Sequence, residues 1–199
     1  PKTKRQLLRE MKRLFCGLLA LCVLVLFNAS ASSGDIIIPG NSSDTVVLVG
    51  YSSEMEQKGI TCVKSNYQGR NKEWVNRTLE YKYKMFNDEE NVDQEEKYTI
   101  EIKVSKYHDV LDVRTSGAAW LVQRSGGNYT YQIRHYDNTS LVISNYIRNI
   151  SVWEPCSFWV KIQYANNFTQ LANETFHKLC SNPKLVGYDI QACQDRYIG

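Results

Sequence analysis

Cysteine is the residue type with the clearest chemistry in this 199-residue sequence. Two of the six cysteines, Cys16 and Cys22, fall in an apolar stretch near the amino terminus. The other four are widely spaced and include no pair at the C-x-x-C spacing of zinc sites; they are Cys62, Cys156, Cys180 and Cys193. An even number of such cysteines predicts two disulfides formed in an oxidising compartment, with three possible connectivities.

Asn-x-Ser/Thr sequons point to the same compartment. A sequon is used only in the secretory lumen and on an exposed surface. The sequence predicts seven N-glycosylation sites, at Asn41, Asn76, Asn128, Asn138, Asn149, Asn167 and Asn173.

Residues 1–31 are predicted to be a secretory signal peptide. Met11 is followed by Lys12 and Arg13, an apolar run over 14–27, and the small-residue end Asn28-Ala29-Ser30-Ala31. The run is shorter than the ~20 residues of a membrane-spanning helix. We therefore expect translation to start at Met11, and a secreted, extracellular single domain over 32–199 without a membrane partner.

Chemistry beyond the cysteines is sparse. There is no G-x-S-x-G, no H-E-x-x-H and no phosphate-binding loop. The three histidines, His108, His135 and His177, are too far apart in sequence to suggest a metal site. Residues 32–199 carry 18 basic and 20 acidic side chains, without the basic block of a nucleic-acid binder. We expect no enzyme activity, no cofactor, no metal and no nucleic-acid partner.

The elements that must position any site are mostly strands. Apolar and polar residues alternate over 77–86 and 97–105, which is typical of half-buried antiparallel strands. Noisier runs cover 45–50, 60–67, 110–114, 118–123, 128–136, 140–145 and 156–164. Turn signals such as Gln68-Gly69 separate them, and the acidic stretch 88–96 is expected to be a solvated hairpin loop. Eight or nine short strands favour an all-β barrel or sandwich.

One segment has helical spacing instead. Apolar residues over 168–180 form a helical stripe, with Thr169 as the expected cap and Pro183 just beyond the end. Asn173 lies off that stripe, so a glycan there would face solvent. A closed barrel of about eight strands has room for one small ligand, so the chain is a candidate carrier.

Several segments together resemble the tick salivary lipocalins, the histamine-binding protein family. Cys156-Ser157-Phe158-Trp159-Val160, a helix ending at Cys180, and Tyr188-Asp189-Ile190-Gln191-Ala192-Cys193 resemble the family's carboxyl-terminal signature. Gly59-Ile60-Thr61-Cys62-Val63 and Tyr129-Thr130-Tyr131-Gln132-Ile133 followed by Tyr136-Asp137-Asn138 resemble earlier segments. The resemblance implies an eight-stranded antiparallel barrel with a carboxyl-terminal α-helix packed outside. It also implies the disulfides Cys62–Cys193 and Cys156–Cys180.

The resemblance implies a ligand class, from which this sequence departs. Amine-binding members hold a protonated amine with two carboxylates, which offset its lost hydration. Here Leu141 and Ser157 stand at those two positions. Asp109, Asp112 or Glu154 would have to replace them, and this departure weakens the expectation of histamine binding.

Aromatic side chains in the expected strands either line a ligand cavity or simply fill the barrel. The candidate pocket residues are Tyr81, Tyr83, Tyr98, Trp120, Tyr131, Leu141, Ser157 and Trp159, with Tyr129 a further aromatic of this kind. Arg134 and His135 alternate on one strand, so only one of them could meet a fatty-acid carboxylate, and solvated surface is the expected place of both.

Two functions follow from these features. The first is a secreted monomer that sequesters a small host mediator, either a biogenic amine or a lipid such as a leukotriene or fatty acid, and so evades host inflammatory defence. The second is a barrel packed shut whose surface binds a host protein of complement or haemostasis. The loss of both acids favours the second function, and dense glycosylation disfavours it. An open interior would favour the first.

Overall fold

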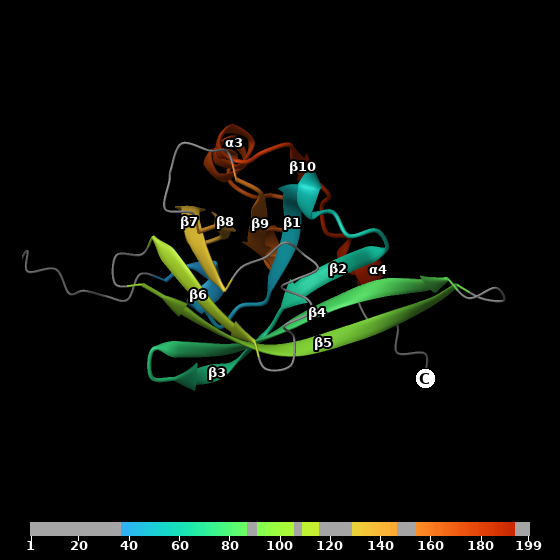
Figure 1. The fold of residues 1–199 in the computed structure, drawn as a ribbon, viewed down its shortest axis with the longest axis horizontal. Coiled ribbons are helices and arrows are strands. Elements are labelled where there is room, and N and C mark those ends of the chain that lie inside the picture. Colours follow the sequence, from blue (N-terminus) through green and yellow to red (C-terminus); the bar gives the residue numbers. More distant parts are fainter. Residues whose placement is uncertain (1–36, 87–90, 106–108, 116–128, 147–153, 194–199) are drawn as a thin grey trace, which may run out of the picture. The chain divides into compact units, whose positions relative to one another are not determined.

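The computed structural model describes residues 37–86, 91–105, 109–115, 129–146 and 154–193 (Figure 1). The expected signal peptide, the strand expected over 118–123 with Trp120, and the sequons at Asn128 and Asn149 lie outside these ranges. Among the described helices, none has the length and apolar character needed to cross a membrane.

Eight antiparallel strands close into a barrel, which confirms the expected fold. Neighbours pair in the order β1-β2-β4-β5-β6-β7-β8-β9, and β1 pairs with β9 to complete the circle. The strands are β1 (Val46–Ser52), β2 (Ile60–Ser65), β4 (Trp74–Phe86), β5 (Asn91–Val104), β6 (Val110–Thr115), β7 (Thr130–Tyr136), β8 (Ser140–Asn145) and β9 (Cys156–Lys161). Two short strands lie off the circle: β3 (Tyr67–Asn71) pairs with β4, and β10 (Pro183–Leu185) pairs with β1.

The longest hairpin, β4–β5, corrects one expectation. Residues 91–96, which include the acids Asp93, Glu95 and Glu96, belong to β5 rather than to a solvated loop. The register places Lys82 opposite Glu95, and Lys64 of β2 approaches Glu95 to 3.5 Å on the outer face. Opposite charges in register stabilise an antiparallel pair, so the charge run that suggested a loop suits a strand.

A second correction concerns the turn expected at Gln68-Gly69. Both residues lie in β3, where the register with β4 shifts between Tyr67 and Gly69. Gly69 has φ +146°, a backbone conformation that glycine adopts readily, so the Gln68-Gly69 pair marks a β-bulge rather than a turn. The chain reverses afterwards, at Lys72, which has φ 55°.

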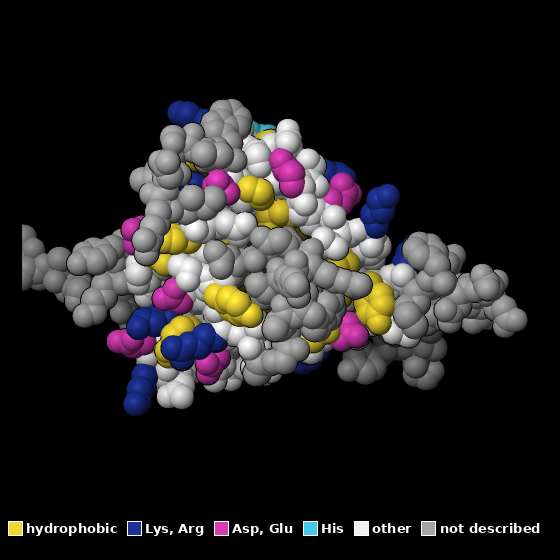
Figure 2. Space-filling model, in the orientation of Figure 1, with side chains coloured by type: hydrophobic (Ala, Val, Ile, Leu, Met, Phe, Trp, Pro, Cys, Tyr) yellow, Lys and Arg dark blue, Asp and Glu magenta, His cyan; other side chains and the backbone are white. Residues whose placement is uncertain are grey.

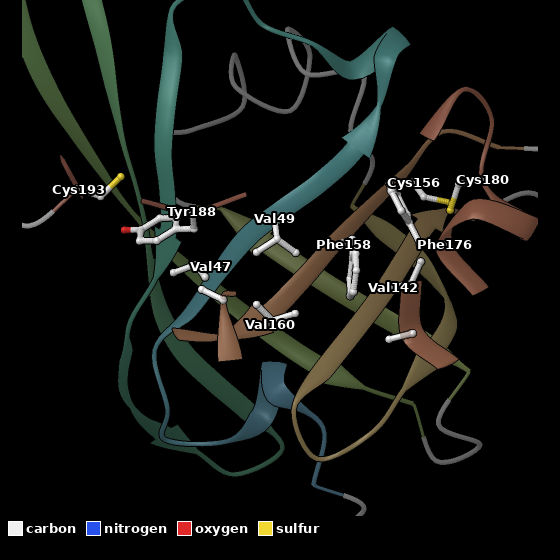
Figure 3. Close-up of a cluster of buried hydrophobic side chains, with 12 residues drawn as sticks. Val47, Val49, Val142, Cys156, Phe158, Val160, Phe176, Cys180, Tyr188 and Cys193 are labelled. Carbon is white, nitrogen blue, oxygen red and sulfur yellow. A yellow bond between two sulfur atoms is a disulfide. The ribbon is translucent and has the colours of Figure 1, made fainter. Parts of the chain in front are cut away.

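The main hydrophobic core lies outside the barrel (Figure 3). The outward faces of β1, β8 and β9 contribute Val47, Val49, Val142, Phe158 and Val160, all fully buried. Helix α3 (Gln170–Leu179) covers them with Ala172 and Phe176, and the rings of Phe158 and Phe176 lie 5.4 Å apart.

Helix α3 begins where the sequence predicts. The Thr169 hydroxyl accepts a hydrogen bond from the Ala172 amide at 3.3 Å, which makes it the N-cap. The predicted apolar stripe is only partly used, because Leu171 is 63% exposed while Ala172 beside it is fully buried. Close approach of α3 and β10 to β1 also explains Gly50, where a Cβ would lie 3.1 Å from both Phe176 and Leu185.

Both disulfides that the resemblance implied are present. Cys62–Cys193 joins β2 to the short helix α4 (Ile190–Cys193), and Cys156–Cys180 joins β9 to the end of α3. The first closes a loop of 131 residues and the second one of 24.

Short 3-10 helices complete the structure: η1 (Pro39–Asn41), η2 (Ser53–Met55) and η3 (Ile162–Tyr164). The segment containing η1 crosses one end of the barrel, where a Cβ on Gly40 would lie 3.3 Å from Ile102 and 3.6 Å from Leu141. We call this end the floor. The opposite end, near η2 and the start of β2, is the mouth.

Candidate functional site

A cavity of about 510 Å³ runs through the barrel interior. Successive residues of a strand point to opposite faces, so residues on β1, β8 and β9 alternate between the outer core and the cavity wall. The inward apolar residues include Val46 and Leu48 of β1, Leu79 of β4, and Ile100 and Ile102 of β5. The barrel is therefore hollow rather than packed shut.

The floor is closed by Pro39 and Gly40 of η1 and held by the buried Arg77. Arg77 donates two hydrogen bonds to Ser65: from Nε to the hydroxyl oxygen at 3.0 Å, and from Nη2 to the carbonyl oxygen at 2.8 Å. The remaining Nη hydrogens go to the carbonyls of Gly40, Ser42 and Asp44 at 3.3, 2.7 and 2.6 Å. These bonds occupy all five guanidinium N–H donors.

Burial lowers the pKa of Arg77 to about 10, so the guanidinium remains charged at neutral pH. The positive charge is stabilised by the carbonyl dipoles and by the nearby carboxylate of Asp44. That carboxylate also pairs with Lys161 at 2.8 Å. Arg77 therefore fixes the floor and has no donor left for a ligand.

The two positions where the resemblance implied acids lie on neighbouring strands of the wall. Leu141 of β8 is paired with Trp159 of β9, two residues from Ser157. The Trp159 Nε1–H donates to the Ser157 hydroxyl oxygen at 2.9 Å. This part of the wall therefore presents an aliphatic side chain, an indole and a hydroxyl, but no carboxylate.

Tyrosines and one acid lie on the wall toward the mouth. Tyr98 stacks on Tyr81 with ring centroids 6.2 Å apart, and its hydroxyl donates to Glu96 Oε2 at 3.0 Å. The Tyr83 hydroxyl donates to Gln94 Oε1 at 2.7 Å. Burial raises the pKa of Tyr81, and its hydrogen bond with Tyr98 and the charge of Glu96 raise it further. Tyr81 is therefore a neutral phenol at any physiological pH.

Most predicted pocket residues reach the cavity wall. Six of them line it: Tyr81, Tyr83, Tyr131, Leu141, Ser157 and Trp159. Tyr98 lies against Tyr81 without lining the cavity, Tyr129 is 48% exposed and away from it, and Trp120 is outside the described residues. Whether the six contact a ligand remains a prediction.

The acids suggested as replacements do not reach the cavity. Asp112 faces outward and accepts a hydrogen bond from Thr130. Asp109 is exposed and accepts a hydrogen bond from the Ser105 hydroxyl, and Glu154 is also absent from the wall. The acid that does line the cavity is Glu96. Sequence reasoning missed it because residues 88–96 read as a loop, although Glu96 has the same parity as Tyr98 and Ile100.

Arg134 and His135 also lie away from the wall. Arg134 donates to Ser144 at 2.7 Å and His135 lies 3.4 Å from Asp137. Both side chains are half-buried, which corrects the expectation that they are solvated.

The described sequons differ in exposure. Asn138 and Asn167 are exposed, whereas Asn41, Asn76 and Asn173 are half-buried. Asn41 Oδ1 accepts from the Ile38 amide at 2.9 Å, and the Oδ1 atoms of Asn76 and Asn173 are enclosed. Asn173 is thus less open to solvent than its place off the apolar stripe suggested.

Comparison with known proteins identifies two relatives from ticks. No protein-family model matches the chain. Japanin of Rhipicephalus appendiculatus is 29% identical over 179 residues, which are 90% of this chain and 97% of Japanin. Japanin-like-RS of Rhipicephalus sanguineus is 27% identical over the same shares of both chains.

A solved structure extends the likeness to three dimensions. Japanin from Rhipicephalus appendiculatus bound to cholesterol superposes with a TM-score of 0.66 at 30% identity, covering 78% of this chain and 99% of that one. With its eight-stranded barrel, its external helix and this relative, the chain belongs to the tick salivary lipocalin family.

Proposed function

We propose that this chain is a secreted salivary lipocalin that sequesters a small apolar host lipid, of the size and character of a sterol, in its barrel. It acts stoichiometrically, lowering the free ligand where the tick feeds and so blunting host inflammatory defence. The observation that carries the proposal is the floored cavity of about 510 Å³ with a largely apolar wall. That volume is within the ~300–1,000 Å³ range of pockets that enclose drug-sized ligands.

Two further points favour a lipid over histamine. Leu141 and Ser157 supply no carboxylate where the resemblance implied two, so the described cavity wall offers an ammonium a single acid, Glu96 near the mouth, in place of a pair. Histamine is also far smaller than the cavity and would leave most of the apolar wall unfilled. Cholesterol in the Japanin structure is a molecule of the proposed class.

The open interior also separates this proposal from the protein-binding alternative. A barrel that acted only through its outer surface would have no use for a cavity, and a void without a ligand forfeits packing energy. The hollow barrel thus supports small-molecule binding more than docking to complement or haemostasis proteins.

Isothermal titration of the secreted, disulfide-intact protein with cyclodextrin-delivered cholesterol and, separately, with histamine tests the proposal. We expect one-to-one cholesterol binding at micromolar affinity or better, about −8 kcal/mol, and no heat from histamine. Histamine binding without cholesterol binding would refute the lipid class.

A matched pair of variants on β5 locates the binding. Ile100 lines the cavity, while Thr99 beside it is exposed on the outer face. Ile100→Trp fills the cavity and should weaken cholesterol binding about tenfold or more, since extra bulk in a closed space forces strain of about 1–3 kcal/mol. Thr99→Trp should leave the affinity unchanged. Equal effects of the two would place the ligand outside the barrel.

A further inference from the structure

The polarity of the cavity changes along its length. At the floor the wall is Pro39, Gly40, Ile102 and Leu141, and every donor of Arg77 is taken. Toward the mouth, β4 and β5 bring Tyr81, Tyr83 and Glu96 to the wall. An amphipathic ligand is therefore favoured in one orientation, with its apolar end at the floor and its polar group at the mouth.

Glu96 differs from the acid next to it. Glu95 faces outward and forms an ion pair with Lys64, whereas Glu96 lies opposite Tyr81 and faces the cavity. Within the described ranges no lysine, arginine or histidine forms an ion pair with Glu96. Its Oε2 accepts from Tyr98, and its Oε1 has no partner among the described residues. The wall thus holds a carboxylate oxygen that is free to accept a hydrogen bond.

The tyrosine hydroxyls around Glu96 are not free to donate. Tyr98 donates to Glu96, Tyr83 donates to Gln94, and Tyr81 is hydrogen-bonded with Tyr98. Each phenol has a single hydrogen. What Tyr81, Tyr83 and Glu96 offer to a ligand is therefore an acceptor, and a ligand group that matches them must donate a hydrogen.

Positive charge at the mouth is a competing attraction. Lys58 and Lys84 also border the cavity, and a carboxylate or sulfate would be drawn to them. Both are exposed, so water and salt screen their charges. The half-buried Glu96 would in turn repel an anionic group.

We propose that the cavity selects a neutral lipid that bears a hydroxyl, and that this hydroxyl donates a hydrogen bond to Glu96 at the mouth. The inference rests on the proposed function, since it names the polar group of the same apolar ligand. It makes Glu96 the residue that distinguishes an alcohol from a ketone or an anion of the same carbon skeleton.

Three sterols with one skeleton test this: cholesterol, its 3-ketone, which accepts but does not donate, and cholesterol sulfate. Wild-type protein should bind the alcohol about tenfold or more tightly than the ketone, the range of a hydrogen bond to a charged group. Glu96→Gln should bring the two within about threefold, because the amide can also donate to the ketone oxygen. Glu95→Gln, which changes the same residue type on the outer face, should keep the wild-type preference.

Each contrary outcome has a distinct meaning. Wild-type protein that binds none of the sterols overturns the proposed function and this inference with it. Equal binding of alcohol and ketone, or a preference that survives Glu96→Gln, overturns the role of Glu96 and leaves the lipid carrier standing. Tighter binding of the sulfate assigns the polar group to Lys58 and Lys84 instead. Circular dichroism of both variants establishes that they are folded.

Discussion

At the scale of single residues, Leu141 and Ser157 determine what the β8–β9 side of the cavity can hold. Both lie on the wall, at the positions where the resemblance implied acids, so the missing charge falls inside the cavity. Trp159 already uses the Ser157 hydroxyl as an acceptor. An ammonium group beside Leu141 and Ser157 would lose its hydration without gaining a carboxylate from either residue.

Restoring the acids should reverse the preference. We expect Leu141→Asp combined with Ser157→Glu to bind histamine and to lose cholesterol affinity by about tenfold or more, because the sterol would desolvate two charges. Titration calorimetry measures the affinity of the variant for histamine and for cholesterol. Leu141→Asn with Ser157→Gln is the uncharged control and should gain no histamine binding. A charged variant that still prefers cholesterol would show that the ligand does not reach these positions.

At the scale of elements, Asp137 ties the external helix to the barrel. It lies in the β7–β8 turn, where Oδ1 accepts from the amide and hydroxyl of Thr139 and from the Ser140 amide, each at 2.7 Å. Its Oδ2 accepts from Thr169, the N-cap of α3, at 2.8 Å. Burial alone would raise the pKa of Asp137, but these hydrogen bonds outweigh it and hold the pKa well below its usual range.

This lowered pKa predicts a pH-dependent stability. A carboxyl whose pKa is depressed in the folded state stabilises the protein above its unfolded pKa of about 3.9 and loses that contribution as the pH falls further. Asp137→Asn should lower the free energy of unfolding by about 1–3 kcal/mol at pH 7. Urea titrations from pH 7 to pH 2.5 should show the gap to wild type narrowing below about pH 4. A gap that stays constant would mean that the ionised carboxylate is not what holds the turn.

The elements also show how far sequence reasoning reaches. Strand alternation predicted a barrel or sandwich and helical spacing predicted the Thr169 cap, because each depends on residues close together in the sequence. The resemblance supplied the eight-stranded barrel and the positions of Leu141 and Ser157, whereas alternation alone did not tell which aromatic side chains face inward. Alternation could not tell which face of a strand meets the core, since both faces of β1, β8 and β9 are apolar. Glu96 and the exposed Leu171 were missed because cross-strand charge pairing and the placement of α3 depend on distant residues.

At the scale of the whole molecule, the two disulfides constrain very different lengths of chain. Cys62–Cys193 spans 131 residues and Cys156–Cys180 spans 24. On the loop-entropy account the first is worth about 5 kcal/mol and the second about 3.5 kcal/mol. The longer bridge is therefore the larger constraint on the unfolded chain.

Paired serine substitutions test this order. Cys62→Ser with Cys193→Ser should lower the free energy of unfolding by about 1.5 kcal/mol more than Cys156→Ser with Cys180→Ser. Urea denaturation of each double variant against wild type gives the two losses. If the shorter bridge proved the more stabilising, contacts of Cys156 and Cys180 in the external core, rather than chain entropy, would set the order.

The position of the core outside the barrel separates what makes the protein stable from what makes it selective. Val47, Phe158 and Val160 face away from the cavity, while Leu48, Ser157 and Trp159 on the same strands face into it. Exchange of an inward side chain such as Ser157 or Trp159 therefore leaves the packing of the external core in place. One scaffold can in this way pass from one class of ligand to another, through changes at alternate residues of each strand.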